Sequence, residues 1–266
     1  MRRSWIVFTD LDGTLLDAND FGFAAALPAI RRLQAEGIPI VPVTSKTVAE
    51  LIPLMERLGL EGPGIVESGS AIVAFEGGSW VVTPLGVPVE QIRSRVPAIE
   101  ERSGARLALF SAMDDAEASR ISGLSGDALG RARQRQFDEP FVLASGDIAR
   151  VARAAGAVGL IVRDGARFHH LCGPVTKGDA VCRLLSTRGA RPGVIALGDA
   201  PMDGDFLALA DIAVIVRAPN GEASEALLST VPHAVVTTAP GPAGWAEAIL
   251  SILDDPTRIA NEPARA

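Results

Sequence analysis

The sequence has few cysteines, few lysines and no long apolar run, and each shortage argues against a class of protein. Two cysteines are too few for a disulfide framework, so we expect a reduced, cytoplasmic setting. No apolar run approaches the roughly 20 residues that span a bilayer, and the short apolar stretch near the start is not typical of a secretory signal. The net charge of −7 argues against a nucleic-acid partner.

Lysine is scarce in a chain that otherwise has many basic residues. Lys46 and Lys177 are the two lysines, and the other basic residues are arginines. Because lysine is a compact point charge and arginine a planar fork, a lysine kept against this bias indicates a role that arginine cannot fill. The alternative, that two lysines remain by chance, stays open at this point.

The order of predicted elements indicates an α/β protein with an insertion. The 266 residues suffice for one large domain or two small ones, and the hydrophobic share of 48% excludes a disordered chain. The opening alternates predicted strands over 5–9, 38–43 and 64–66 with predicted helices over 23–36 and 47–58, as in a parallel sheet. The same alternation resumes with a helix over 177–187, a strand over 194–197, a helix over 204–209 and a strand over 212–216.

The segment between these two parts has a different pattern. A hairpin is predicted over 71–83, around two glycines. After it we expect helices over 89–103, 125–135 and 148–155 and strands over 141–144, 160–163 and 167–171. The predicted fold is therefore a Rossmann-like parallel-sheet core, residues 1–83 and 173–266, with an inserted α+β cap domain, residues 84–172.

Polar side chains follow the predicted core strands. Asp10 and Asp12 come directly after the first strand, and Thr44 follows the second. Ligands of open α/β sheets bind outside the carboxyl ends of the strands. Asp10 is a candidate nucleophile and Asp12 a candidate acid and base, although an ordinary polar turn is the alternative for this pair.

Two further groups lie where the core resumes. Lys177 opens a predicted helix, where an acidic residue is the usual choice, and this favours a role in binding anionic oxygen. Asp199 and Asp203 follow the late strand and are candidates for holding a hard cation such as Mg²⁺. Helix capping by Asp203 is the competing interpretation.

These residues occur in motifs that resemble a known superfamily. Residues 8–17 (FTDLDGTLLD) look like the first motif of the haloacid dehalogenase superfamily, and Thr44, Lys177 and residues 198–203 (GDAPMD) look like its second, third and fourth. The insertion resembles the α/β cap of the Cof-like branch. The resemblance implies a magnesium-dependent phosphatase in which Asp10 attacks phosphorus, Asp12 serves as acid and base, and Thr44 and Lys177 neutralise the phosphoryl oxygens.

The resemblance also implies a metal site. The cation would be held by Asp10, Asp12 and Asp199, with Asp203 supporting the metal site or Lys177. One position departs from the superfamily pattern, because Met202 stands where asparagine is usual, and a thioether cannot coordinate magnesium. We therefore expect a weakened or rearranged metal site rather than a dead one.

A closer similarity extends over nearly the whole chain. Residues 43–47 (VTSKT), 132–140 (ARQRQFDEP) and 165–170 (GARFHH) resemble the mannosyl-3-phosphoglycerate phosphatase family. This implies a phosphorylated sugar–glycerate as the small-molecule substrate and mannosylglycerate, a compatible solute, as the product. The candidate contacts to its glycerate and sugar are Ser45, Lys46, Arg133, Arg135, Glu139, Arg167 and His170. Ser68 departs from this pattern, because the usual residue there is asparagine.

Three alternatives remain open. The same chemistry could act on glucosyl-3-phosphoglycerate or another sugar phosphate, which a substrate panel would separate. A phosphomutase would keep the phosphate on a sugar acceptor instead of releasing it to water. A binding protein with a decayed site, suggested by Met202, would bind ligand without turnover. The sequence does not indicate the oligomeric state.

Overall fold

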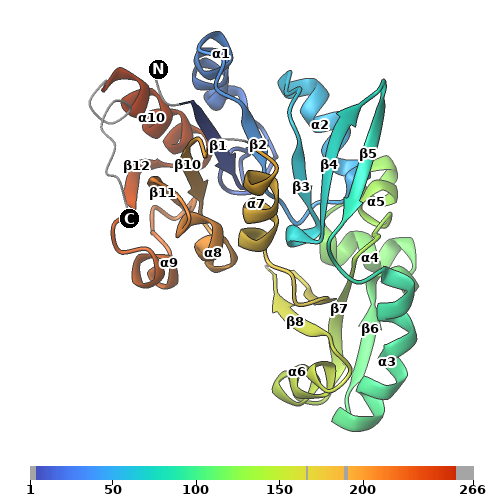
Figure 1. Cartoon of the computed structure of the whole chain (residues 1–266). Coiled ribbons are helices and arrows are strands. Elements are labelled where there is room, and N and C mark those ends of the chain that lie inside the picture. Colours follow the sequence, from blue (N-terminus) through green and yellow to red (C-terminus); the bar gives the residue numbers. More distant parts are fainter. Residues whose placement is uncertain (1–3, 166, 189–190, 256–266) are drawn as a thin grey trace. The chain divides into compact units, whose positions relative to one another are not determined.

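The computed structural model describes residues 4–165, 167–188 and 191–255, and these divide into two units (Figure 1). Unit 1 takes the described residues of Met1–Thr44, Leu58–Ile65 and Lys177–Ala266, and unit 2 takes Ser45–Arg57 and Val66–Thr176. Because the two units are defined by contacts between residues, unit 2 contains residues 45–57 and 66–83, which the sequence analysis assigned to the core, together with the inserted segment. The predicted domain boundaries at 83/84 and 172/173 remain a prediction.

The parallel sheet expected for the core is present in unit 1 (Figure 1). Its strands lie in the order β12-β11-β10-β1-β2, and every adjacent pair is parallel. Their bounds are β1 Trp5–Thr9, β2 Ile40–Pro42, β10 Gly193–Gly198, β11 Ile212–Arg217 and β12 Val235–Pro240. Each residue of β1 and β10 is buried, as expected for apolar strands at the centre of a parallel sheet covered on both faces.

Helices pack on this sheet and on one another. They are α1 (Leu27–Ala35), α7 (Lys177–Ser186), α8 (Gly204–Leu207), α9 (Glu225–Thr230) and α10 (Gly241–Asp254). Helix α10 packs against β11, β12 and α1, and α7 packs against α8. Trp245 of α10 is fully buried and donates its indole N–H to the Thr9 hydroxyl at 3.0 Å. The indole thus fixes the end of the central strand.

The segments of unit 2 begin with a helix and a hairpin. Helix α2 (Val48–Leu58) starts with a capping box, in which the Thr47 hydroxyl accepts from Glu50 N–H at 3.1 Å and the Glu50 carboxylate accepts from Thr47 N–H at 2.9 Å. Strand β3 (Gly64–Val66) leads to the antiparallel hairpin of β4 (Ala71–Glu76) and β5 (Ser79–Pro84). The predicted hairpin around the two glycines is confirmed.

An antiparallel sheet between two helical layers forms the rest of unit 2. Its order is β6-β7-β9-β8, with β6 Arg106–Leu109, β7 Asp138–Ser145, β8 Ile161–Asp164 and β9 His169–Cys172. Phe141 packs in the apolar cluster of α3 (Val89–Ser103) and α6 (Ile148–Gly156). Val142, the next residue, packs against a second apolar cluster, formed with α4 (Asp115–Ser122) and α5 (Gly126–Ala132). Successive strand residues point to opposite faces, so the two helix pairs cover opposite faces.

Several predicted elements differ from the observed ones. Strand β7 begins three residues earlier than the predicted strand over 141–144, and β9 begins at His169 rather than at 167. Helix α5 ends at Ala132, so the predicted helical stretch to 135 is too long. The elements β6, α4, α9, β12 and α10 had no counterpart in the sequence analysis.

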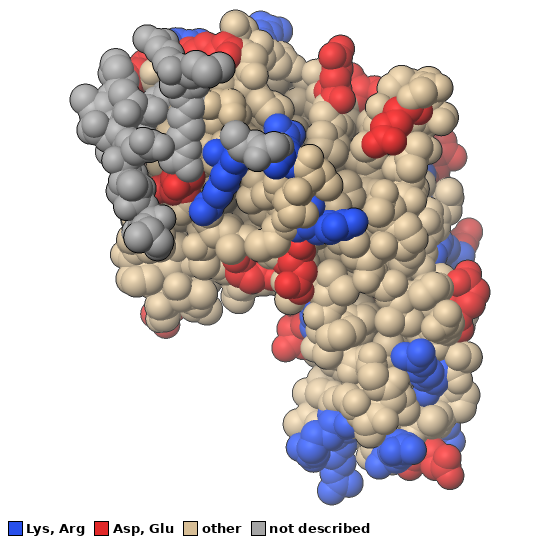
Figure 2. All heavy atoms as spheres, viewed as in Figure 1, with Lys and Arg blue, Asp and Glu red and all other residues tan. Residues whose placement is uncertain are grey.

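Surface and membrane properties were also considered in the sequence analysis. On the face shown in Figure 2, acidic and basic side chains are interspersed over both units. Within residues 4–165, 167–188 and 191–255, none of the helices combines the length and apolar character that crossing a bilayer requires.

The close approach of α10 to β12 generates a stability prediction. A Cβ atom at Gly244 would lie 2.0 Å from the Ala239 carbonyl oxygen, so Gly244→Ala must displace the helix. We expect a loss of about 3 kcal/mol or more, measured by urea unfolding. Gly130→Ala is the matched control, because Gly130 lies inside α5 with nothing within 4 Å of the added Cβ. It should keep or raise stability, and equal losses in both variants would contradict the packing argument.

Candidate functional site

The carboxyl ends of three core strands bring polar residues to one edge of the sheet. Asp10 follows β1, and its backbone N–H donates to the Leu197 carbonyl of β10 at 2.9 Å. On the other side of β1, the Val43 N–H donates to the Thr9 carbonyl at 2.7 Å, so pairing continues to the residue before buried Thr44. Parallel pairing therefore places Asp10 between the residues that follow β2 and those that follow β10.

The Lys177 ammonium group joins two of the carboxylates. It donates to Asp10 Oδ1 and to Asp203 Oδ1, each at 2.6 Å, and its side chain is 2% exposed. Burial acts to lower the pKa of Lys177, but the two carboxylates outweigh it and hold the pKa above its usual value. Lys177 is the first residue of α7, so the helix start delivers a permanent positive charge to the edge of the sheet.

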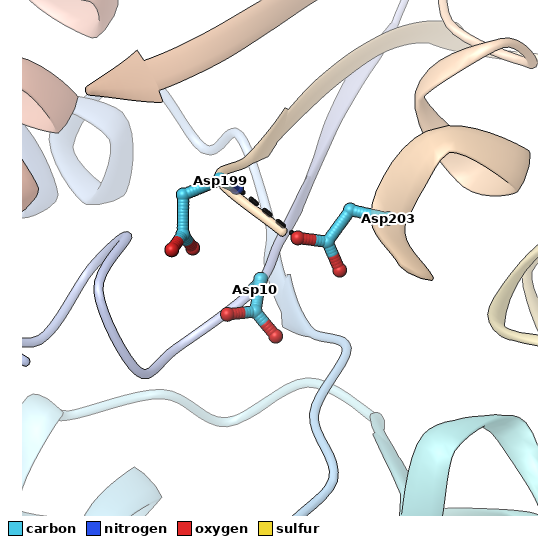
Figure 3. A group of neighbouring side chains, drawn as sticks. All are labelled: Asp10, Asp199 and Asp203. Atoms are coloured by element: carbon cyan, nitrogen blue, oxygen red, sulfur yellow. Dashed lines mark hydrogen bonds between the residues drawn. The ribbon is translucent and has the colours of Figure 1, made fainter. Parts of the chain in front are cut away.

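Asp203 is held by both of its carboxylate oxygens. While Oδ1 accepts from Lys177, Oδ2 accepts from the backbone N–H groups of Asp199 at 3.1 Å and Ala200 at 2.9 Å (Figure 3). Asp203 precedes α8 but makes no side-chain capping bond to that helix, so its carboxylate binds the Ala200 N–H ahead of the short 3₁₀ helix in addition to the lysine. Met202 lies in the same short 3₁₀ helix, Pro201–Asp203, and is partly buried.

Asp199 is oriented by the loop that follows β1. The Thr14 hydroxyl donates to Asp199 Oδ1 at 2.5 Å. Gly13 has a φ of +88°, and a Cβ at this position would lie 2.6 Å from Asp199 Oδ2. Gly13 is thus required both for the turn and for the space that the Asp199 carboxylate fills. Asp12 lies in the same turn and is partly exposed.

The donor set at this edge suits a divalent cation with oxygen ligands. One carboxylate oxygen each from Asp10, Asp199 and Asp203 lies within 4.8 Å of the others (Figure 3). Burial raises the pKa of Asp199 to about 6 and that of Asp10 well above its usual value, with Lys177 opposing both shifts. Three carboxylates beside one ammonium leave excess negative charge, which a hard cation such as Mg²⁺ would neutralise.

A second cluster lies within unit 2. Arg135 Nη1 donates to the Ser45 carbonyl at 2.7 Å and to the two Asp138 oxygens at 3.2 and 3.3 Å. His170 Nδ1 lies 2.8 Å from Asp138 Oδ2. Burial acts to raise the pKa of Asp138, but Arg135 and His170 outweigh it and hold the pKa below its usual value. Of the candidate substrate contacts, Arg135 and His170 therefore meet at Asp138, and Ser45 joins them through its backbone carbonyl on Arg135.

The remaining predicted substrate contacts lie in other parts of unit 2. Glu139 is fully buried, accepts from the Ser111 N–H at 3.0 Å and pairs with Arg93 at 2.5 Å. Arg133 donates to the Met113 carbonyl at 2.7 Å. Arg167, which is exposed, donates to the Ser122 carbonyl. Lys46 is partly buried, and its carbonyl accepts from Glu67 N–H at 3.0 Å.

Three residues of these networks were not assigned a role from the sequence. Thr14 is part of the first motif, and its distance of 185 residues from Asp199 hides their contact. Asp138 stands next to Glu139 in the quoted segment, but its contact to His170 depends on the register that pairs Pro140 with His170. Glu67 was not named as a site residue from the sequence, because nothing in the sequence signals that its carboxylate is fully buried.

Comparisons with known proteins find relatives that match nearly the whole chain. The family model for haloacid dehalogenase-like hydrolases matches residues 7–116. The chain is 32% identical over 267 residues to a protein of Persephonella marina named glucosyl-3-phosphoglycerate/mannosyl-3-phosphoglycerate phosphatase, covering 94% of this chain and 97% of that protein. It is also 32% identical to a protein of Methanococcoides burtonii with the same name, covering 93% and 97%.

Solved structures share the fold. A haloacid dehalogenase-like hydrolase from Bacteroides thetaiotaomicron superposes with a TM-score of 0.68 at 19% sequence identity. The superposition covers 94% of this chain and all of the other chain. The similarity therefore includes the inserted segment as well as the parallel-sheet core.

The space that Gly13 leaves for Asp199 generates a prediction about cation binding. Gly13→Ala should displace the Asp199 carboxylate and weaken Mg²⁺ binding by about 10-fold or more, measured by isothermal titration calorimetry. Gly78→Ala is the matched control, because Gly78 has a φ of +87° and nothing within 4 Å of the added Cβ. It should lose about 1 kcal/mol of stability and keep its Mg²⁺ affinity. Equal affinity in the two variants would contradict the argument.

The Asp138 cluster generates a prediction about stability and pH. Asp138→Asn leaves the Arg135 charge buried without its carboxylate partner, so we expect a loss of about 3 kcal/mol at pH 7. A carboxyl group with a lowered pKa stabilises the fold above its unfolded pKa, about 3.9, and this contribution is lost as the pH falls through the folded value. The difference between wild type and variant should therefore shrink below about pH 4.

Urea unfolding at pH 7 and at acidic pH measures this difference. The matched control is Asp164→Asn, because Asp164 forms a comparable pair with His169 at 2.6 Å but its side chain is 83% exposed. Exposed ion pairs contribute little, so this variant should unfold much like the wild type at pH 7. A difference between wild type and Asp138→Asn that stays constant with pH would exclude the ionised carboxylate as its cause.

Proposed function

Because the chain belongs to the haloacid dehalogenase-like hydrolases and is a phosphoric monoester hydrolase, we propose that it converts mannosyl-3-phosphoglycerate to mannosylglycerate and phosphate. The observation that carries this proposal is the similarity to the two phosphatases of that name, which includes the inserted segment. Glucosyl-3-phosphoglycerate is the second candidate substrate, because both relatives are named for both compounds.

In the proposed mechanism, an Asp10 oxygen attacks the phosphorus atom and displaces the oxygen on carbon 3 of the glycerate. Asp12 gives its proton to that oxygen as the P–O bond breaks, which leaves an aspartyl-phosphate on Asp10. Asp12 then removes a proton from water, and the water oxygen attacks phosphorus, releasing phosphate and free Asp10. Each step uses a carboxylate already positioned at the edge of the sheet.

Positive charge at the site supports both steps. Lys177 and the Thr44 hydroxyl would bind the phosphoryl oxygens as negative charge moves among them. A Mg²⁺ ion held by Asp10, Asp12 and Asp199, with Asp203 in support, would offset the repulsion between carboxylate and phosphate. The contact of Lys177 with Asp10 and Asp203 supports this assignment, because it holds the ammonium beside the proposed nucleophile.

We assign recognition of the glycerate and sugar to unit 2. Arginine forks bind carboxylates in pairs of hydrogen bonds, and carboxylates and imidazoles bind sugar hydroxyls. The proposed contacts are Ser45, Lys46, Arg133, Arg135, Glu139, Arg167 and His170. We also propose a cytoplasmic location, supported by the absence of a disulfide in the described part of the chain, where both Cys172 and Cys182 are free.

The proposed function predicts magnesium-dependent release of phosphate. Purified protein should release phosphate from mannosyl-3-phosphoglycerate, and chelation of the metal should stop the reaction. Asp10→Asn should lower kcat by about 10³-fold or more, because the amide is a poor nucleophile. Asp17→Asn is the matched control: Asp17 is the last residue of the same motif, but its carboxylate accepts the Asn19 N–H at 2.8 Å in an exposed turn.

The outcomes separate the candidate substrates. Faster release of phosphate from glucosyl-3-phosphoglycerate would make it the preferred substrate and mannosyl-3-phosphoglycerate the second candidate. No release from either compound would contradict both, unless the metal site itself is defective. Met202→Asn decides that case, because asparagine restores an oxygen donor, and activity gained in this variant would locate the defect at the metal site.

A further inference from the structure

Glu67 is a buried carboxylate that the proposed mechanism does not use. It follows β3 directly, and it is fully buried. Glu67 and Ser68 have φ values of +45° and +57°, in the left-handed region that residues other than glycine rarely adopt. Two consecutive strained residues persist where the surrounding contacts fix them, and such strain is concentrated at functional sites.

Three successive backbone amides bind the Glu67 carboxylate. Oε2 accepts from Phe137 N–H at 2.7 Å and from Gln136 and Asp138 N–H, each at 3.1 Å, and Oε1 accepts from Gln136 N–H at 3.0 Å. Burial and the Asp138 carboxylate raise the pKa of Glu67 to about 7. Successive N–H groups that converge on one anion form a nest, which offsets the cost of burying the charge.

The segment bound by Glu67 carries the Asp138 cluster. Arg135 precedes the three amides, and Asp138 supplies the last of them, so both side chains start from backbone that the Glu67 carboxylate fixes. On its other side, the Glu67 N–H donates to the Lys46 carbonyl at 3.0 Å, and the Ser68 carbonyl accepts from Arg163 at 2.8 Å. Glu67 therefore joins two chain segments that hold proposed substrate contacts, and its neighbour Ser68 adds a contact to β8.

We propose that Glu67 is a positioning residue for substrate recognition: its carboxylate holds residues 136–138 in the conformation that presents Arg135 and His170, through Asp138, to the part of the substrate beyond the phosphoryl group. This inference rests on the proposed function. Glu67 acts through the backbone it binds, and it takes no part in the phosphoryl transfer.

The test is a comparison of two substrates in Glu67→Gln. The glutamine keeps the shape of the side chain, but one oxygen becomes an NH₂ group that faces N–H donors. We expect KM for mannosyl-3-phosphoglycerate to rise about 10- to 100-fold, while kcat/KM for p-nitrophenyl phosphate, which lacks glycerate and sugar, stays unchanged. Hydrogen exchange at the amides of 136–138 should become faster.

Glu100→Gln is the matched control. Glu100 is another carboxylate of unit 2 that accepts a backbone N–H, from Leu107 at 2.8 Å, but it lies in α3 and contacts β6 rather than 136–138. It should leave both substrates and the exchange of 136–138 unchanged. Glu67→Asp keeps the charge but shortens the reach, and it takes the place of Glu67→Gln if that variant does not fold.

Each outcome decides the inference. An equal loss with both substrates, or no change with either, would overturn it. If the wild type hydrolyses p-nitrophenyl phosphate but neither sugar phosphoglycerate, the proposed substrate is wrong. The proposed role of Glu67 in recognising that substrate is then also wrong. The exchange data still separate the cases: accelerated exchange in Glu67→Gln shows that the carboxylate holds 136–138, and unchanged exchange shows that it does not.

Discussion

The contact of one ammonium group with two carboxylates is the constraint on which the proposed active site, at the carboxyl edge of the parallel sheet, depends. Lys177 Nζ lies 2.6 Å from both Asp10 and Asp203, inside a protein where isolated charges are costly. Asp203 in turn fixes the backbone of the turn after β10, which sets the direction of Asp199. The side chain that neutralises the site thus also orders it, and arginine, with its wide fork, would not fill the same space.

Unit 2 uses the same principle with different residues. Asp138 lies between Arg135 and His170, and the backbone beneath Asp138 is bound by the Glu67 carboxylate. The ionisable side chains of this cluster are almost entirely removed from water. Because a misplaced partner leaves a buried charge, such networks tolerate little displacement, and this rigidity is what recognition of a defined ligand requires.

The sequence predicted the core of unit 1 better than unit 2. The strands that end before Asp10, Thr44 and Asp199 were predicted because continuous apolar runs mark buried parallel strands. Strand ends in a parallel sheet share an edge, so local signals sufficed to bring these residues together. Helix α10 was missed as a whole because Gly241, Pro242 and Gly244 at its start resemble a loop, whereas proline in the first turn is compatible with a helix.

In unit 2 the contacts depend on register and on buried backbone, which local patterns do not encode. Arg135 and His170 could be named from a resemblance, but their shared partner Asp138 follows from the antiparallel pairing of β7 with β9. The role of Glu67 follows from amides that lie about 70 residues away in the chain. Neither relation leaves a periodic signal, so both emerge only once the strands are paired.

The interrupted course of the chain sets the order in which the two units can be completed during synthesis. The central strand β1 pairs with β10, so Trp5 cannot form its pair with Gly193 until nearly three quarters of the chain has been synthesised. All residues of unit 2 come before Lys177, and they leave the ribosome earlier. Unit 2 can therefore assemble while the first strand of unit 1 has β2 beside it but still lacks β10. Until β10 is made, β1 keeps one unpaired edge beside apolar side chains, and such edges favour misassociation.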